Sequence, residues 1–143
     1  MREVLLARWR EVGDKTVELA EAVPAAAYDA PTAPGARTFA EALRHLAFWN
    51  EHARETLRGH APDGSANALP AEAYPDRASV LAALRASVGG VADAIAASRD
   101  ADAEAVVANL AHAAEHYGQL AVYARLAGEA PPAPRSDALA GAA

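Results

Sequence analysis

The sequence contains no cysteine among its 143 residues. Disulfide bonds, thiolate metal sites and catalysis by a protein thiol are therefore excluded, and the absence fits a reducing compartment such as the cytoplasm. A strong positive charge is also missing, because thirteen basic residues are scattered among nineteen acidic ones and the net charge is −6. A surface that binds nucleic acid needs clustered basic residues, so we expect no nucleic-acid partner.

Long apolar runs are missing as well. No stretch of about 18 residues is free of polar side chains, so we expect no membrane-spanning segment and no membrane partner. The residues from Met1 to Val4 include a glutamate before any apolar run can form, which is unlike a secretory signal peptide. Together with the absence of cysteine, these features predict a cytoplasmic protein.

The sequence does contain alanine-rich segments that are separated by proline and glycine. Alanine is the strongest helix former, and the apolar residues recur at alternating spacings of four and three, as on one face of a helix. We predict helices over residues 2–23, 38–58, 77–98 and 102–127. Thr38 and Glu41 form a capping-box pattern at the start of the second helix. Six charged residues of that helix are predicted to face solvent: Glu41, Arg44, Glu51, Arg54, Glu55 and Arg58.

Four amphipathic helices without a strand pattern predict an all-α protein with the fold of a four-helix bundle. We expect a single domain over residues 1–134, and a disordered tail over residues 135–143 because these are small and polar. The connection over about residues 60–76 is long. It could carry the chain back along the bundle, in which case the second and third helices run parallel in an up-down-down-up order.

The five histidines are the main candidates for metal-binding residues in this sequence. His112 and His116 lie four residues apart, so both project from one face of the fourth helix and can reach one ion. His45 and His52 lie at the edge of the buried face of the second helix. His45 and His112 stand roughly 12 and 15 Å from the starts of their helices, so they can meet at similar heights. His60 falls in a predicted loop, where we expect it to be solvated.

The residues alone leave two interpretations of the inward histidines open. A single inward histidine is commonly a hydrogen-bonded core residue, and one His-x-x-x-His pair is a weak signal for a metal. Alternatively, neutral imidazoles bind zinc, nickel, copper or iron. Three of them would leave one coordination position open, which is the arrangement of catalytic zinc.

Two stretches resemble a known family. Residues 34–47 read Pro-Gly-Ala-Arg-Thr-Phe-Ala-Glu-Ala-Leu-Arg-His-Leu-Ala and resemble the second helix of the DinB/YfiT-like superfamily. Residues 112–128, which begin His-Ala-Ala-Glu-His-Tyr-Gly-Gln-Leu, resemble the last helix of that superfamily, and the similarity extends over essentially the whole chain. The resemblance implies a four-helix bundle that binds a metal through one histidine of the second helix and a pair from the fourth.

This resemblance assigns the metal ligands to His45, His112 and His116. It implies one divalent ion, with zinc as the expected metal and nickel or iron as alternatives. Homodimers are common among proteins of this kind, so a homodimer is expected here. Some related proteins are metal-dependent transferases that use low-molecular-weight thiols such as bacillithiol or mycothiol, so a thiol from solution is a further implied cofactor.

Three kinds of function are compatible with such a site. The first is a metal-dependent transferase or hydrolase that activates a thiol or a water, with Glu115, Tyr117 and Gln119 as candidate catalytic or supporting residues. The second is a non-catalytic dimeric binding or stress-response protein with a structural or incidental ion. The third is an inverted zinc peptidase, suggested by the His-x-x-Glu-His spacing. These peptidases need a further acidic ligand downstream, where only Glu129 and Asp137 are present, and they are much larger chains with sheets, so we interpret this match as a coincidence.

Overall fold

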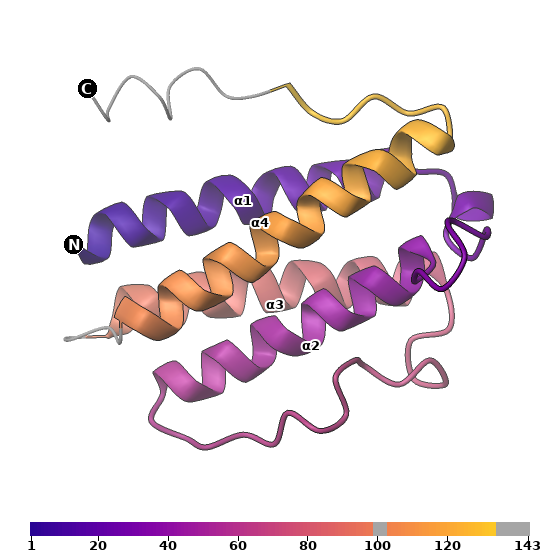
Figure 1. The fold of residues 1–143 in the computed structure, drawn as a ribbon. Helices are drawn as coiled ribbons and strands as arrows, with labels where there is room; N and C mark the ends of the chain where they lie inside the picture. Colours follow the sequence, from indigo (N-terminus) through magenta and orange to yellow (C-terminus); the bar gives the residue numbers. More distant parts are fainter. Residues whose placement is uncertain (99–102, 134–143) are drawn as a thin grey trace.

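The computed structural model describes residues 1–98 and 103–133, and its regular structure is helical throughout (Figure 1). The helices are α1 (Arg2–Ala22), α2 (Phe39–Leu57), α3 (Arg77–Ala97) and α4 (Ala103–Leu126), and a single 3₁₀ turn, η1 (Ala25–Ala27), follows α1. The prediction of an all-α four-helix bundle is confirmed, and each predicted helix boundary that falls on described residues lies within about one residue of the observed one. The predicted start of the fourth helix, residue 102, lies outside the described residues. The predicted disordered tail, residues 135–143, lies outside the described residues.

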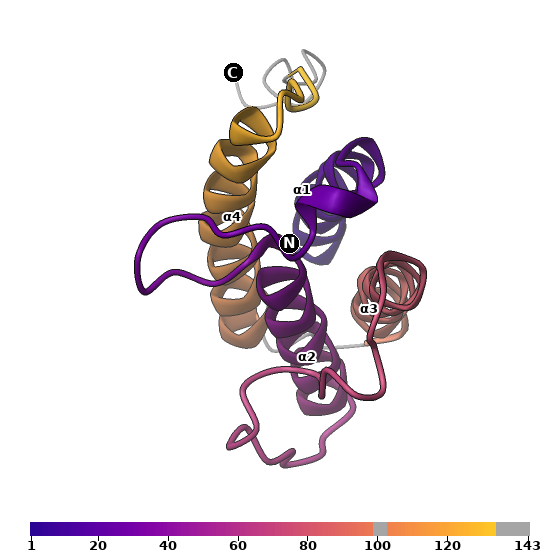
Figure 2. The ribbon, with the colours of Figure 1, turned by 90° about the vertical axis from the view of Figure 1, so that its right-hand side faces the viewer.

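The helices are connected in the up-down-down-up order. α1 packs against α3 and α4, and α2 packs against the same two helices, so α1 and α2 lie on a diagonal of the bundle (Figure 2). Arg2 Nη1 donates to the Ser98 carbonyl at 2.7 Å, and Arg77 Nη2 donates to the Glu21 carbonyl at 2.6 Å. These two bonds join opposite ends of α1 and α3, which are therefore antiparallel. α2 runs in the same direction as α3 (Figure 1).

The connection between α2 and α3 makes this parallel pair possible. α2 is about 28 Å long, and the residues between Leu57 and Arg77 can span about twice that distance when extended. The connection runs back along the bundle toward the start of α2 (Figure 1). Leu69 N donates to the Arg44 carbonyl at 3.2 Å, which fixes the connection against α2. The long loop is therefore a strap over α2 and forms one wall of the site described below.

The core between the four helices is made of aliphatic side chains and a few aromatic ones. Trp9 of α1 is almost fully buried, and its indole N–H donates to the Val88 carbonyl of α3 at 3.0 Å. Gly13 allows the same two helices to approach, because a Cβ there would lie 2.5 Å from a methyl group of Val88. The largest fully buried side chains are Trp9, Tyr28, Phe39, Leu19, Leu43, Leu46, Leu84, Ile95, Leu120, Val23, Val80 and Val91.

The start of α2, which sets the height of His45, is held from both sides. Thr38 and Glu41 form the predicted capping box, with Glu41 N to Thr38 Oγ1 at 3.2 Å and Thr38 N to Glu41 Oε2 at 2.8 Å. Tyr28 lies in the connection before α2 but is buried, and its hydroxyl donates to the Ala20 carbonyl at 2.7 Å. Burial raises the pKa of this phenol to about 12, so it remains protonated and can donate at neutral pH.

One predicted solvent-facing residue of α2 is buried instead. Arg44 is 9% exposed, and its Nη1 donates to the Tyr74 carbonyl at 3.3 Å. The prediction that Arg44 faces solvent was wrong because the α2–α3 connection covers that side of the helix. An arginine can be buried under this loop because its apolar methylene groups pack against the protein while its guanidinium donates to a backbone carbonyl.

α3 is more apolar than the sequence analysis anticipated. Within the described residues it is the one helix long and apolar enough to cross a membrane, with a mean hydropathy of 1.5. Arg85 and Asp93 are its only charged residues after Arg77. The helix packs against α1 and α2, and eight of its residues are buried there: Val80, Leu81, Leu84, Ser87, Val88, Val91, Ala94 and Ile95. Its composition is thus that of a core helix in this bundle.

Candidate metal centre

Three histidines from two antiparallel helices converge in the bundle. His45 projects from α2, and His112 and His116 project from successive turns of α4. His45 Nε2 and His112 Nε2 are 3.1 Å apart, and one nitrogen from each of the three rings lies within 4.8 Å of the other two. The ring centroids are separated by 4.5 to 5.1 Å. This group, called the three-histidine cluster below, could hold one metal ion.

Two of the three rings are oriented by hydrogen bonds on their outer nitrogens. His45 Nδ1 lies 2.6 Å from the Asn67 carbonyl oxygen, and His116 Nδ1 lies 3.0 Å from Gln119 Oε1. Both partners are acceptors, so each Nδ1 carries the proton and donates. In a neutral ring the proton on Nδ1 leaves a lone pair on Nε2. A second hydrogen bond of this kind is the usual support of a metal-binding histidine.

The third ring, His112, lacks such a partner. Its Nδ1 is buried and has no hydrogen bond within the part of the chain that the structure describes. Its Nε2 faces another imidazole nitrogen, that of His45, rather than an oxygen. A buried ring nitrogen without a protein partner leaves room for an additional ligand at this ring. The donor set of three imidazoles fits a divalent zinc, nickel or iron ion.

The electrostatics of the cluster favour neutral rings. Burial is the largest cause that lowers the pKa of His112, and together with the nearby His116, His45 and Arg37 it brings that pKa to about 4. Burial is also the main cause that lowers the pKa of His45 and of His116. All three rings are therefore neutral at pH 7. Neutral imidazole is the form that binds a metal.

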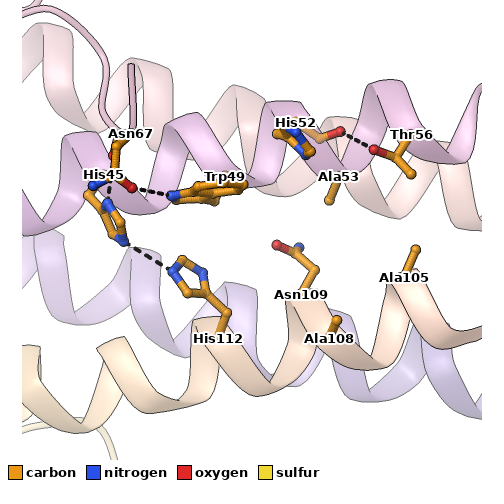
Figure 3. A pocket seen from close by; sticks show the side chains of 10 residues that line it. All are labelled: His45, Trp49, His52, Ala53, Thr56, Asn67, Ala105, Ala108, Asn109 and His112. Atoms are coloured by element: carbon orange, nitrogen blue, oxygen red, sulfur yellow. Dashed lines mark hydrogen bonds between the residues drawn. The ribbon is translucent and has the colours of Figure 1, made fainter. Parts of the chain in front are cut away.

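A cavity of about 490 Å³ lies between α2 and α4 and reaches the cluster at one end (Figure 3). We call it the α2–α4 groove. Trp49 forms part of its wall, and the indole N–H donates to Asn67 Oδ1 at 2.9 Å. The residues that line the groove are His45, Trp49, His52, Ala53, Thr56, Asn67, Ala105, Ala108, Asn109 and His112. A ligand in the groove would therefore touch two of the three clustered histidines.

The three candidate catalytic residues from the sequence differ in whether they contact the three-histidine cluster. Gln119 is exposed but accepts the hydrogen bond from His116 described above. Glu115 is exposed, and its charge is the smallest of the causes acting on the pKa of His116. The Tyr117 ring turns toward α1, where the Lys15 ammonium lies 4.5 Å from its centroid. Gln119 is thus the only one of the three with a hydrogen bond to the cluster among the described residues.

The two remaining histidines lie outside the cluster. His52 lines the α2–α4 groove and packs on Trp49 with ring centroids 4.9 Å apart. His60 is exposed after the end of α2, with Nδ1 2.6 Å from Glu55 Oε2. The structure therefore brings His45, and not His52, to the pair on α4.

Asn67 is the supporting residue that the sequence analysis missed. Its carbonyl orients His45, its side chain holds Trp49, and its backbone has a φ of 58°. Asparagine is one of the few residues other than glycine that commonly adopts this left-handed conformation. An asparagine after Gly64 in a long loop is a signal for a turn. Nothing local indicates that the turn contacts a histidine 22 positions earlier.

The chain belongs to the DinB superfamily, because the model of that family matches residues 8–124 and so covers most of the sequence. The matched region contains the three-histidine cluster and every residue of the α2–α4 groove. No curated protein matches the chain closely enough to count as a relative. Family and geometry together describe a metal-binding DinB-like bundle.

Proposed function

We propose that this protein is a metal-dependent enzyme whose divalent ion is held by His45, His112 and His116. The observation that carries the proposal is the convergence of their ligand atoms, all within 4.8 Å of one another, at one end of the α2–α4 groove. Three protein ligands are one fewer than a closed structural zinc site uses, so a position is left for substrate. We propose zinc as the ion, and nickel or iron as alternatives that accept the same ligands.

The reaction class we propose is group transfer to, or hydrolysis of, a small molecule. An ion at this site would supply the Lewis acidity that activates a water or a thiol at neutral pH. The protein contributes fixed ligands, because Asn67 and Gln119 each hold one histidine in place. Since the chain has no cysteine, a thiol nucleophile would come from solution, such as bacillithiol or mycothiol.

Proton transfer needs a group that faces the substrate. Glu115 is exposed and Tyr117 turns toward α1, which disfavours both for this role. Among the described residues that line the groove, His52 is the only titratable side chain outside the three-histidine cluster. We therefore assign proton exchange with a bound substrate to His52, and a supporting role to Gln119.

One observation favours a second candidate function. The described residues that line the groove include no carboxylate, which is the usual general base beside a hydrolytic zinc ion. On this alternative the ion is structural, in a dimeric binding or stress-response protein. A structural ion contributes directly to folding. A large loss of thermal stability on chelation, without any turnover, would favour this alternative.

The test of the enzyme proposal is a screen of zinc-loaded protein with bacillithiol or mycothiol and a set of electrophilic acceptors. The matched variants are His116→Ala, which removes a cluster ligand, and His60→Ala, which removes an exposed histidine. We expect turnover in the wild type and in His60→Ala, and its loss in His116→Ala. Turnover that persists undiminished in His116→Ala would show that the cluster does not carry the chemistry.

A further inference from the structure

The α2–α4 groove has an unusual charge composition for a cavity beside a candidate metal centre. Of the ten described residues that line it, none is an aspartate, glutamate, lysine or arginine. The apolar part of its walls is formed by the Trp49 ring and by the alanines at positions 53, 105 and 108. An anionic group placed along these walls would lose its hydration without gaining a cationic partner. The groove is therefore built for an uncharged molecule with an apolar body.

Two polar side chains along the groove, those of Asn109 and Thr56, present hydrogen-bond acceptors. Asn109 projects from α4 toward α2 (Figure 3), and its Nδ2 donates to Asn50 Oδ1 at 3.4 Å. Asn50 in turn donates to Ser87 Oγ at 3.1 Å, so a buried chain of bonds fixes the amide. One N–H of Asn109 is engaged in this way, so the fixed amide offers its carbonyl oxygen as well as a second N–H. The Thr56 hydroxyl donates to the His52 carbonyl at 2.9 Å and so offers oxygen lone pairs.

The surroundings of the groove strengthen this preference. Asp63 is close enough to His52 for an electrostatic interaction and adds negative charge at that side of the groove. Arg37 does not line the groove, but its positive charge acts on His45 and His112 at the cluster end, so the negative side of the groove is the one near His52. Carbonyl and hydroxyl oxygens near a negative charge attract N–H and O–H groups and repel carboxylates and phosphates.

We propose that the α2–α4 groove selects an uncharged, largely apolar substrate that carries a hydroxyl or amide donor, with its reactive end at the three-histidine cluster. This inference rests on the proposed function for the role of the cluster. Of the two reactants in the proposed thiol transfer, the electrophilic acceptor is the one that binds in the groove. The polar thiol is not expected to bind there. A cavity of about 490 Å³ is within the range that holds a drug-sized molecule.

The experiment compares three small probes of similar size on the metal-free full chain. The probes are phenylbutanol, which has a donor; butylbenzene, which has none; and phenylbutyrate, which is anionic. Binding is measured by isothermal titration calorimetry and by the change in tryptophan fluorescence, to which Trp49 in the groove and Trp9 in the core contribute. We expect phenylbutanol to bind about tenfold more tightly than phenylbutyrate, because the carboxylate is desolvated without a partner. Butylbenzene should fall between them.

Matched variants locate the binding. Ala108→Phe fills the groove, whereas Ala111→Phe adds the same ring to an exposed position of α4 that does not line it. Phenylbutanol affinity should fall about tenfold or more in Ala108→Phe and stay within about twofold in Ala111→Phe. Thr56→Lys adds a cation to the wall and should reverse the preference in favour of phenylbutyrate, which gives a second test if Ala108→Phe does not fold.

The outcomes separate this inference from the proposed function. Equal or tighter binding of phenylbutyrate by the metal-free wild type, or an unchanged phenylbutanol affinity in a folded Ala108→Phe, would overturn the groove assignment. Zinc binding should be the same in Ala108→Phe and the wild type, since residue 108 is not in the cluster. A protein that binds phenylbutanol as expected but no metal would contradict the proposed function and leave the probe preference of the groove standing.

Discussion

Replacing Asn67 should weaken metal binding even though its side chain is not a ligand. The carbonyl of Asn67 accepts the Nδ1 proton of His45 at 2.6 Å, and the residue holds a φ of 58° to place that carbonyl. A β-branched residue is strongly disfavoured at positive φ, at a cost of about 1–3 kcal/mol. Asn67→Val should therefore move the loop and release His45. Loss of such a supporting bond typically costs about 10- to 100-fold in metal affinity.

Asn67→Gly provides the matched control for this prediction. Glycine adopts positive φ readily, so the carbonyl can stay in place while only the bond from Trp49 to the side chain is lost. Zinc affinity is measured by competition with a chromophoric chelator at pH 7. We expect Asn67→Gly to remain within a few-fold of the wild type and Asn67→Val to fall by about 10- to 100-fold. An Asn67→Val protein that binds zinc as tightly as the wild type would refute this role of the loop.

Three further predictions concern the cluster and the core. His116→Ala should abolish tight zinc binding in the same competition assay, and unchanged binding would remove this residue from the ligand set. In metal-free protein the pKa of His112 is lowered to about 4, so below about pH 6.5 the unfolded chain binds a proton that the folded chain does not. The free energy of unfolding should therefore fall as the pH drops from about 6.5 to 4, as measured by urea denaturation; a flat profile would contradict it. Gly13→Ala should lower the melting temperature, at a cost of about 1–3 kcal/mol for overpacking, because its Cβ would lie 2.5 Å from a valine methyl of α3. Gly89→Ala meets no atom within 4 Å and should raise it.

Helix positions were largely predictable because they depend on local patterns. Thr38 and Glu41 lie three residues apart and form the predicted capping box, whose hydrogen bonds involve only its own helix turn. The parallel arrangement of α2 and α3 was one of the paths that the length of the connection between them permitted. The exposure of Arg44 was predicted wrongly, because it depends on a contact with Tyr74 that is 30 residues away in sequence. The helical pattern of a segment does not indicate whether a distant loop folds back over its polar face.

The candidate site was predictable only in part, for the same reason. The spacing of His112 and His116 places them together on α4 whatever the rest of the chain does. The choice of His45 over His52 came from the family resemblance, and the close approach of its ring to His112 appears only in three dimensions. Neither the support from Asn67 nor the uncharged lining of the α2–α4 groove has a local signal. Both arise where segments distant in sequence meet.

The most direct test of the central claim is the metal content of protein that is purified without an affinity tag. The measurement is elemental analysis by mass spectrometry on the wild type and on a His45→Ala/His112→Ala/His116→Ala variant that folds, as judged by circular dichroism. We predict about one divalent ion per chain in the wild type, since one ion needs all three ligands. The variant should contain almost none. A wild type without metal that also fails to bind added zinc, or a variant with the same metal content, would contradict the account.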